Sequence, residues 1–247
     1  PPSQILSGLV GSEMCIRDRC IYRREIILKT FTHIAHDYEF KKLKTINIKG
    51  KRYYNVDKNL HLPSITSITG SLPEKLKGLR EWRERIGAKE ASKITVQASR
   101  RGTKVHELIE NYLNNDLDNK FVLGRDMFET MIPVLDNIDN IYEQEVPLWS
   151  CELGVAGRCD CIAEYDGVLS VIDFKTSRKP KQESWIKDYF LQACAYSKMW
   201  EERTGSSIDQ LVILIAVDNA EPQVFISDAN EWHDELKSII YENKQRV

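Results

Sequence analysis

Residues 157–177 read GRCDCIAEYDGVLSVIDFKTS, and this stretch decides the fold that we expect. Two mostly apolar segments flank Asp166-Gly167, a dipeptide that favours a two-residue hairpin turn. If the turn is that tight, Tyr165 pairs with Val168 and the register of the whole hairpin follows. A one-residue bulge would change that register, so the pairing is a prediction.

The same register places Asp160 directly opposite Asp173. Directly opposed side chains have Cβ atoms about 4.5–5.5 Å apart, and two carboxylates at that distance repel each other. A divalent cation held by both would remove the repulsion. Lys175 lies on the same face, about 6.6 Å further along the strand. A solvated surface hairpin is the competing interpretation, but an opposed acidic pair with a lysine inside apolar strands favours a metal-dependent catalytic centre.

Two helical segments supply further candidate residues. Gln192 and Tyr196 are four positions apart in the segment after the hairpin, so they share a helix face; an amphipathic helix with a half-buried tyrosine would give the same pattern. His106 lies in RRGTKVHELIE, residues 100–110. A lone histidine is more often structural, but its basic neighbours favour a position near phosphate: Arg100, Arg101 and Lys104.

The overall composition does not indicate a binding partner, whereas the distribution of charge along the chain does. The chain has 247 residues, 42% hydrophobic and 29% charged, with a formal net charge of −2, as in an ordinary globular protein. Residues 74–104 carry ten Lys/Arg against four Glu, and residues 175–187 carry five against one. Such segments are typical of solvated helix surfaces, but together they could form a phosphate-facing stripe. No apolar run is long enough to span a bilayer, so no membrane is expected.

The order of the elements predicts an α/β layout in which helices precede a small sheet. We expect a hairpin over residues 44–56 and helices over 73–86, 88–113, 126–142, 182–203 and 230–243. We expect strands over 145–151, 158–165, 168–175, 211–217 and 223–227. Residues 9–19, LVGSEMCIRDR, read as one frame of a transposon-type sequencing adapter. We therefore treat 1–19 as an assembly artefact, 20–61 as an extension with the hairpin, and 62–247 as one domain, with a helical part (62–142) and a catalytic sheet core (143–247).

Three motifs together resemble the RecB-like branch of the PD-(D/E)xK nucleases: GRCD at 157–160, IDFKTS at 172–177, and Gln192-x-x-x-Tyr196. The proline of the family name is absent, because Cys159 precedes Asp160. The segments LPSITSITG (62–70) and RGTKVHELIENYL (101–113) occur in the same order in mitochondrial, phage and bacterial exonucleases of this branch. The resemblance covers roughly residue 62 to the C-terminus. It implies a restriction-endonuclease-like fold, with a small mixed central sheet flanked by helices and an N-terminal helical annex.

The resemblance also implies roles for individual residues. The metal ligands would be His106, Asp160, Asp173 and the backbone carbonyl of Phe174. Lys175 would orient or activate the attacking water, Glu145 would assist through metal or water, and Gln192 and Tyr196 would support the site. Thr176 and Ser177 could donate to a phosphate. The local positive charge, and not the resemblance, adds further expected contacts to the DNA backbone: Arg178, Lys179, Lys181, Arg100, Arg101 and Lys104. The cofactor would be Mg²⁺, with Mn²⁺ as a substitute.

An iron–sulfur cluster is not expected, because the C-terminal cysteine group that such a cluster uses in some relatives is missing. The implied activity is a metal-dependent exonuclease that hydrolyses DNA from its ends, prefers single strands and acts in replication, recombination or repair. A structure-specific or restriction-like endonuclease and a non-catalytic DNA-binding protein stay open as alternatives. The adapter-like segment favours a phage or bacterial source. The expected location is therefore the cytoplasm, or the mitochondrion if the source is eukaryotic.

Overall fold

A computed structural model describes residues 29–117 and 122–245 of the chain. The adapter-like segment, and with it the boundary proposed at residue 19, lies outside the described residues. Within the described part, none of the helices combines the length and the apolar character that a membrane-spanning helix requires.

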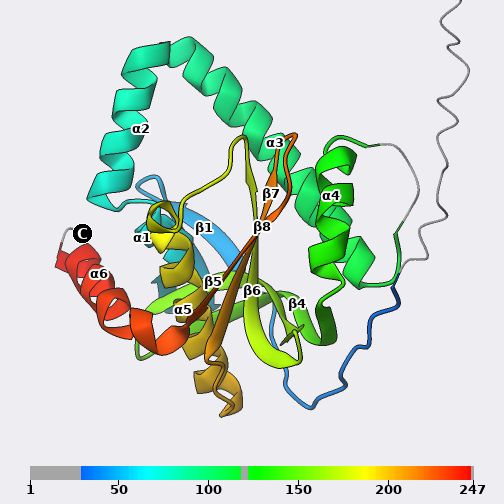
Figure 1. Cartoon of the computed structure of the whole chain (residues 1–247). Helices are drawn as coiled ribbons and strands as arrows, with labels where there is room; N and C mark the ends of the chain where they lie inside the picture. The colour runs from blue at the N-terminus through cyan, green and yellow to red at the C-terminus, as the bar shows by residue number, and fades with distance from the viewer. Residues whose placement is uncertain (1–28, 118–121, 246–247) are drawn as a thin grey trace, which may run out of the picture.

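A five-stranded mixed sheet forms the centre of the molecule, in the order β4-β5-β6-β7-β8 (Figure 1). Its strands are β4 (Ile138–Ser150), β5 (Val155–Tyr165), β6 (Val168–Ser177), β7 (Gln210–Val217) and β8 (Gln223–Asp228). β6 and β7 are parallel, and the other neighbouring pairs are antiparallel. A parallel pair needs a long crossover connection, which here contains helix α5 (Lys187–Thr204). The predicted small mixed sheet is therefore confirmed.

Helices cover both faces of this sheet, so its apolar residues are buried on two sides. One core cluster packs α3 (Ala88–Leu113) and α4 (Arg125–Leu135) against one face. The other packs α1 (Ile65–Thr69), α5 and α6 (His233–Gln245) against the opposite face. Burial on both sides explains why β7, QLVILIAV, is a nearly continuous apolar run. The predicted α/β class with flanking helices is confirmed.

A second, smaller sheet precedes the helices. The predicted hairpin over residues 44–56 forms from β1 (Lys44–Ile48) and β2 (Lys51–Asp57), and β3 (Leu60–Pro63) adds a third strand. Lys49 and Gly50 both have positive φ, 50° and 79°, as a tight hairpin turn requires. Tyr54, Val56 and Leu62 of this sheet are buried against Ala156 of β5. The small sheet therefore packs directly on the central sheet.

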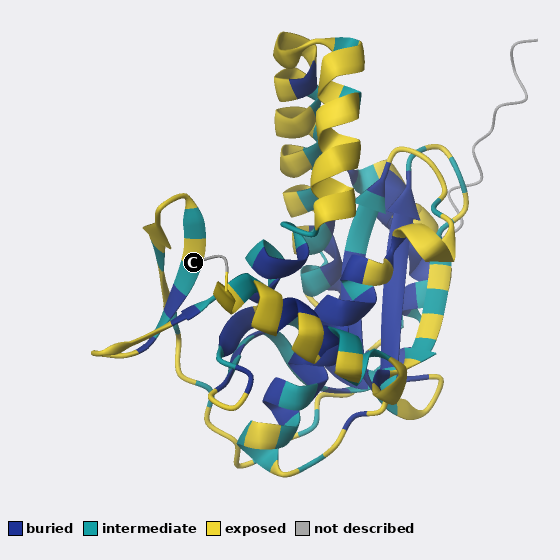
Figure 2. Cartoon of the chain, turned by 90° about the vertical axis from the view of Figure 1, so that its left-hand side faces the viewer, coloured by how far each residue is buried: buried dark blue, intermediate teal, exposed yellow. Residues whose placement is uncertain are grey.

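The N-terminal helical annex projects from the rest of the molecule. Helix α2 (Pro73–Ile86) has no buried residue, and in the first half of α3 only Ala91 is buried. Figure 2 shows these two helices projecting together as a largely exposed arm. The arm carries most of the first basic segment, residues 74–104. Both helices have the bounds that the apolar periodicity predicted.

One predicted helix is wrong in its second half. The sequence favoured a helix over residues 126–142, but α4 ends at Leu135 and β4 begins at Ile138. Ile138 and Ile141 are both buried because the β4–β5 register shifts between Asp139 and Glu143. This irregularity gives a three-residue spacing of buried residues inside a strand, which imitates the period of a helix.

Two further boundaries differ from the prediction. Helix α5 begins at Lys187 and not near residue 182, and a short 3₁₀ turn, Glu183–Trp185, precedes it. The closing helix α6 begins at His233 after a second 3₁₀ turn, Ala229–Trp232. Both differences have the same cause. A 3₁₀ turn at the start of a helix has nearly the same side-chain pattern as the helix itself, so the sequence does not separate the two.

Candidate active site

The hairpin register follows the prediction as far as the candidate site and then ends. β5 and β6 pair from Tyr165↔Val168 to Cys161↔Ile172. Asp160 and Asp173 would form the next pair, but no ladder pairing exists there. The Asp160 carboxylate instead accepts a hydrogen bond of 2.9 Å from the backbone N–H of Phe174. Asp160 thus links the two strands by a hydrogen bond where their ladder ends, and its second carboxylate oxygen remains available to a ligand.

Glu145 lies beside Asp160 on the other neighbouring strand. The pairs Gln144↔Cys161 and Val146↔Cys159 flank this position on β4 and β5. Glu145 itself has φ of 49°, a left-handed conformation that a non-glycine residue rarely adopts inside a strand. Such strain persists only where the surrounding structure holds it, and it is concentrated at functional sites.

His106 reaches the sheet from helix α3. Gly102, one turn earlier, allows the helix to approach β6 closely, since a Cβ on Gly102 would lie 3.3 Å from Oγ1 of Thr176. The His106 ring packs edge-on to the ring of Phe174, with centroids 6.2 Å apart. Its Nδ1 lies 3.8 Å from Oδ2 of Asp160. A glycine and an aromatic residue therefore position the imidazole over the end of the hairpin.

His106, Glu145 and Asp160 together form a cluster that could hold a metal ion. One ligand atom from each residue lies within 4.8 Å of the others, and all three side chains are partly exposed. Carboxylate oxygens suit Mg²⁺ and Mn²⁺, and imidazole suits later transition metals better than Mg²⁺. The donor set therefore fits a divalent cation, and Mn²⁺ fits at least as well as Mg²⁺.

Asp173 lies apart from this cluster, in the protein interior. It is 1% exposed and forms an ion pair with Lys175, which follows on the same strand. Gln192 of α5 donates a hydrogen bond of 2.9 Å to Asp173 Oδ1. Gln192 also contacts the hydroxyl of Tyr196, at 3.4 Å. The structure thus brings together four of the predicted residues, with Asp173 at their centre and Lys175 between it and the cavity.

Gly157 of the GRCD motif makes room for Tyr196. A Cβ on Gly157 would lie 2.5 Å from Cε1 of Tyr196 and 2.9 Å from its hydroxyl oxygen. The tyrosine is 1% exposed, and its hydroxyl accepts from Gln192, which also donates to Asp173. Burial, followed by the nearby Cys159 and Asp160, raises the pKa of Tyr196 well above its usual value. Tyr196 is therefore a neutral hydrogen-bonding group at neutral pH.

Two carboxyl groups of the site, those of Glu145 and Asp173, have raised pKa values. Burial, then the negative charge of Asp160, raises the pKa of Glu145 to about 7, against the opposing effect of Arg158. Burial also raises the pKa of Asp173 to about 6, although Lys175 opposes the shift. Burial alone would lower the pKa of Lys175, but the charges of Asp173 and Asp160 outweigh it and raise this pKa. The lysine is therefore fully protonated at neutral pH.

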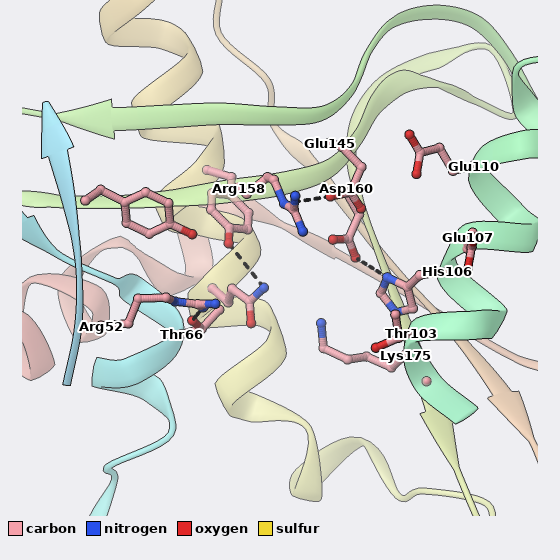
Figure 3. A pocket seen from close by; sticks show the side chains of 14 residues that line it. Arg52, Thr66, Thr103, His106, Glu107, Glu110, Glu145, Arg158, Asp160 and Lys175 are labelled. Atoms are coloured by element: carbon pink, nitrogen blue, oxygen red, sulfur yellow. Dashed lines mark hydrogen bonds and ion pairs between the residues drawn. The ribbon is translucent and has the colours of Figure 1, made fainter. Parts of the chain in front are cut away.

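A cavity of about 640 Å³ opens above these groups. His106, Glu145, Asp160, Lys175, Gln192 and Tyr196 all line it. Figure 3 shows Arg52 and Thr66 on one side, with His106, Glu107 and Glu110 on the other. The sequence interpretation did not include these lining residues as site members: Arg52, Thr66, Thr103, Glu107, Glu110 and Arg158. The spacing of His106 and Glu110, four residues apart on one helix, was a usable signal for Glu110; nothing local indicated Arg52.

The basic residues expected to contact DNA fall into different environments. Arg101 forms an ion pair of 3.0 Å with Asp218, at the end of β7, and Lys104 pairs with Glu107 at 2.6 Å. Arg100 is exposed on α3, as are Arg178 and Lys179 in the loop after β6. The hydroxyl of Ser177 is turned into that loop, where it donates to the Lys179 carbonyl at 2.7 Å. Thr176 lies against Gly102, and Lys181 is held through its backbone by Gln223.

In this α/β fold, a histidine and two acids lie at the end of a hairpin, beside a buried Asp–Lys pair. This arrangement resembles the nuclease site that the sequence indicated. Human mitochondrial genome maintenance exonuclease 1 is 28% identical over 170 residues, which is 63% of this chain and 48% of the human protein. The proteins of that name from mouse and Xenopus tropicalis are 30% identical over 131 and 147 residues. The similarity confirms the resemblance to these exonucleases.

The chain matches only part of each of these relatives. The matched region spans less than half the length of each of these relatives, 48%, 38% and 42%. A solved Eubacterium rectale protein provisionally named an exonuclease has a TM-score of 0.40 and 14% identity, covering 61% of this chain and 65% of its own. No protein-family model matches the chain.

Proposed function

We propose that this chain is a divalent-metal-dependent nuclease that hydrolyses phosphodiester bonds of DNA. The observation that carries the proposal is the His106–Glu145–Asp160 cluster, which opens onto the same cavity as Lys175. The relatives named as exonucleases support the same activity. Asp173 would join the ligand set as the sequence resemblance implies, through the oxygen that now pairs with Lys175.

Each residue of the site has a role that follows from its surroundings. His106, Glu145 and Asp160 would hold the cation, which would withdraw charge from the scissile phosphate and lower the pKa of a bound water. Lys175 is held by Asp173 at the cavity wall, so its positive charge can stabilise the negative charge that develops on the phosphate. Gln192 and Tyr196 keep the Asp173 carboxylate in place. The backbone carbonyl of Phe174, on the same strand as Asp173, would complete the ligand set.

The substrate we propose is DNA with a free end, preferentially single-stranded, degraded in replication, recombination or repair. The exposed basic arm would bind the strand through its phosphates, independently of sequence, and this binding should weaken as salt increases. The arm residues in question include Arg100 and Lys104, and the loop after β6 adds Arg178, Lys179 and Lys181. The enzyme would act in the cytoplasm of a bacterial or phage-infected cell, or in the mitochondrion of a eukaryote.

A digestion assay tests the activity. Labelled single-stranded DNA is incubated with the protein and Mg²⁺ or Mn²⁺, with chelator as a control. Asp173→Ala and Lys175→Ala should lose activity by about 100-fold or more, since each removes charge stabilisation at the reacting centre. Lys198→Ala is the matched control, because Lys198 pairs with Glu201 on α5, outside the cavity. Equal digestion by Lys175→Ala and Lys198→Ala would refute the assigned site.

A comparison of linear and covalently closed circular DNA separates the exonuclease from the alternative endonuclease. An exonuclease degrades only the linear strand, whereas an endonuclease also nicks the circle. Binding of both without cleavage in any metal would leave the non-catalytic DNA-binding protein as the correct interpretation.

A further inference from the structure

Arg52 brings a positive charge into the cavity from outside the expected nuclease domain. It belongs to β2, in the region of residues 20–61 that the sequence interpretation treated as an extension. Its side chain lines the cavity together with His106, Asp160 and Lys175 (Figure 3). The small N-terminal sheet is therefore part of the cavity wall.

Arg52 differs from the other cations that line this cavity. Each of the others lies beside an acidic group: Lys175 beside Asp173, and Arg158 beside Glu145 at 2.7 Å. Among the residues that the structure describes, no carboxylate pairs with Arg52. An unneutralised guanidinium facing a cavity is suited to an anion that arrives with the substrate.

Two hydroxyl groups orient the Arg52 guanidinium. Nε and Nη2 donate to Oγ of Ser64, at 3.3 and 3.2 Å, and Nη2 also donates to Thr66. The two hydroxyls are hydrogen-bonded to each other at 2.7 Å. Nη1 makes no hydrogen bond to any described residue, so its two N–H groups remain for a ligand. A guanidinium held in this way loses little conformational entropy when it binds a phosphate.

Arg52 also stands where the cavity meets a neighbouring hollow of about 710 Å³. That hollow lies between residues 40–45, β2 and β4. Four residues line both spaces: Arg52, Tyr54, Glu145 and Arg158. A strand that leaves the metal cluster toward the N-terminal sheet would therefore pass Arg52 and Tyr54.

We propose that Arg52 binds the nucleic-acid phosphate that flanks the scissile phosphate, so that the N-terminal sheet sets the position of the strand in the site. This inference rests on the proposed function. The shared chemistry is a phosphate oxygen, which could belong to an internucleotide phosphate or to the terminal phosphate of the strand.

The test replaces the phosphates of a fluorescent single-stranded oligonucleotide one at a time with neutral methylphosphonates. Binding is measured by anisotropy with Ca²⁺ in place of Mg²⁺, for wild type, Arg52→Gln, Arg52→Lys and Lys51→Gln. Lys51 is the matched control, because it is the adjacent cation of the same strand and lines neither hollow. A substrate with a 5′-hydroxyl separates a terminal phosphate from an internucleotide one.

We expect wild type to lose binding strongly at one position next to the scissile phosphate. Arg52→Gln should bind the unmodified strand about tenfold more weakly, the size expected for a hydrogen bond to a charged group. It should also be insensitive to the methylphosphonate at that position, and its log–log salt slope should be shallower by about 0.7. Arg52→Lys should keep part of the positional sensitivity, and Lys51→Gln should keep all of it.

Equal positional sensitivity in wild type and Arg52→Gln would overturn the proposal. A lower melting temperature of Arg52→Gln, with no change in how binding depends on the methylphosphonate position, would also overturn it. The same oligonucleotides are then given Mg²⁺ or Mn²⁺. If wild type binds them through Arg52 but does not cut them, the proposed nuclease function fails and the Arg52 site stands.

Discussion

Lys175 forms an ion pair with Asp173, two residues earlier on the same strand, where the carboxylate is 1% exposed. This pair predicts that single and double substitutions change the free energy of unfolding by different amounts. Lys175→Met should destabilise the fold by about 3 kcal/mol, because it leaves a buried acid without its cation. Asp173→Asn combined with Lys175→Met should recover most of that loss, because no unpaired charge remains. Urea unfolding measures both.

Nuclease activity should not follow stability in this series. The double variant should be as inactive as Lys175→Met, since the lysine charge is absent from both. A double variant as unstable as Lys175→Met would contradict the proposed pairing.

Glu145 should make the stability of the metal-free protein depend on pH. Its pKa in the folded state is raised to about 7, mainly by burial. A raised folded pKa means that the folded protein binds the proton more tightly, so stability falls as pH rises from about 4.5 to 7. Glu145→Gln should therefore have a higher melting temperature than wild type at pH 8, by a few degrees, and a smaller advantage at pH 5. Melting curves in chelator measure the difference.

Divalent cations should reverse the order of the melting temperatures of wild type and Glu145→Gln. A cation binds the ionised carboxylate, so Mn²⁺ at about 100 times its dissociation constant should stabilise wild type by about 2.7 kcal/mol. Glu145→Gln should gain less, and the wild-type gain should increase as pH rises through 7. A gain independent of pH in wild type would exclude Glu145 as a ligand.

Gly157→Ala should damage the site although position 157 carries no functional group. The added methyl would lie 2.5 Å from the Tyr196 ring and 3.1 Å from Ile65. Overpacking of this kind costs about 1–3 kcal/mol, and here it would displace Tyr196. We expect a lower melting temperature and an activity at least tenfold lower. Gly167→Ala, in the open turn of the same hairpin, is a control in which strain arises without a clash at the site.

Arg100 and Arg101 should behave differently despite being adjacent. Arg100 is exposed, and Arg100→Gln should weaken DNA binding and flatten its salt dependence without a loss of stability. Arg101 is paired with Asp218 and its side chain is 21% exposed, so Arg101→Gln should lower the free energy of unfolding by about 1 kcal/mol. Anisotropy titrations and urea unfolding separate the two effects. Equal effects of both variants on DNA binding would show that the Asp218 pair opens to release Arg101.

The elements most accurately predicted were those with strong local signals. The Asp166-Gly167 turn gave the correct register of β5 and β6, and the apolar periodicity gave the bounds of α2 and α3. The prediction was wrong over residues 136–142, where an irregular strand imitates a helical period. Periodicity reports which side chains are buried, and a bulge changes that pattern without changing the kind of element.

The chain's local chemistry determined that Asp160, Asp173 and Lys175 would lie near one another, because a two-residue turn and the alternation of a strand leave little freedom. Tertiary packing decided which groups share the cavity. His106 arrives on a helix that Gly102 brings against β6, Glu145 arrives on a separate strand, and Arg52 comes from another sheet. These contacts join residues far apart in the sequence, and their geometry depends on how whole helices and sheets pack, which no local pattern encodes. Packing also buried the Asp173 carboxylate, so that it pairs with Lys175 inside the protein and does not face the cavity.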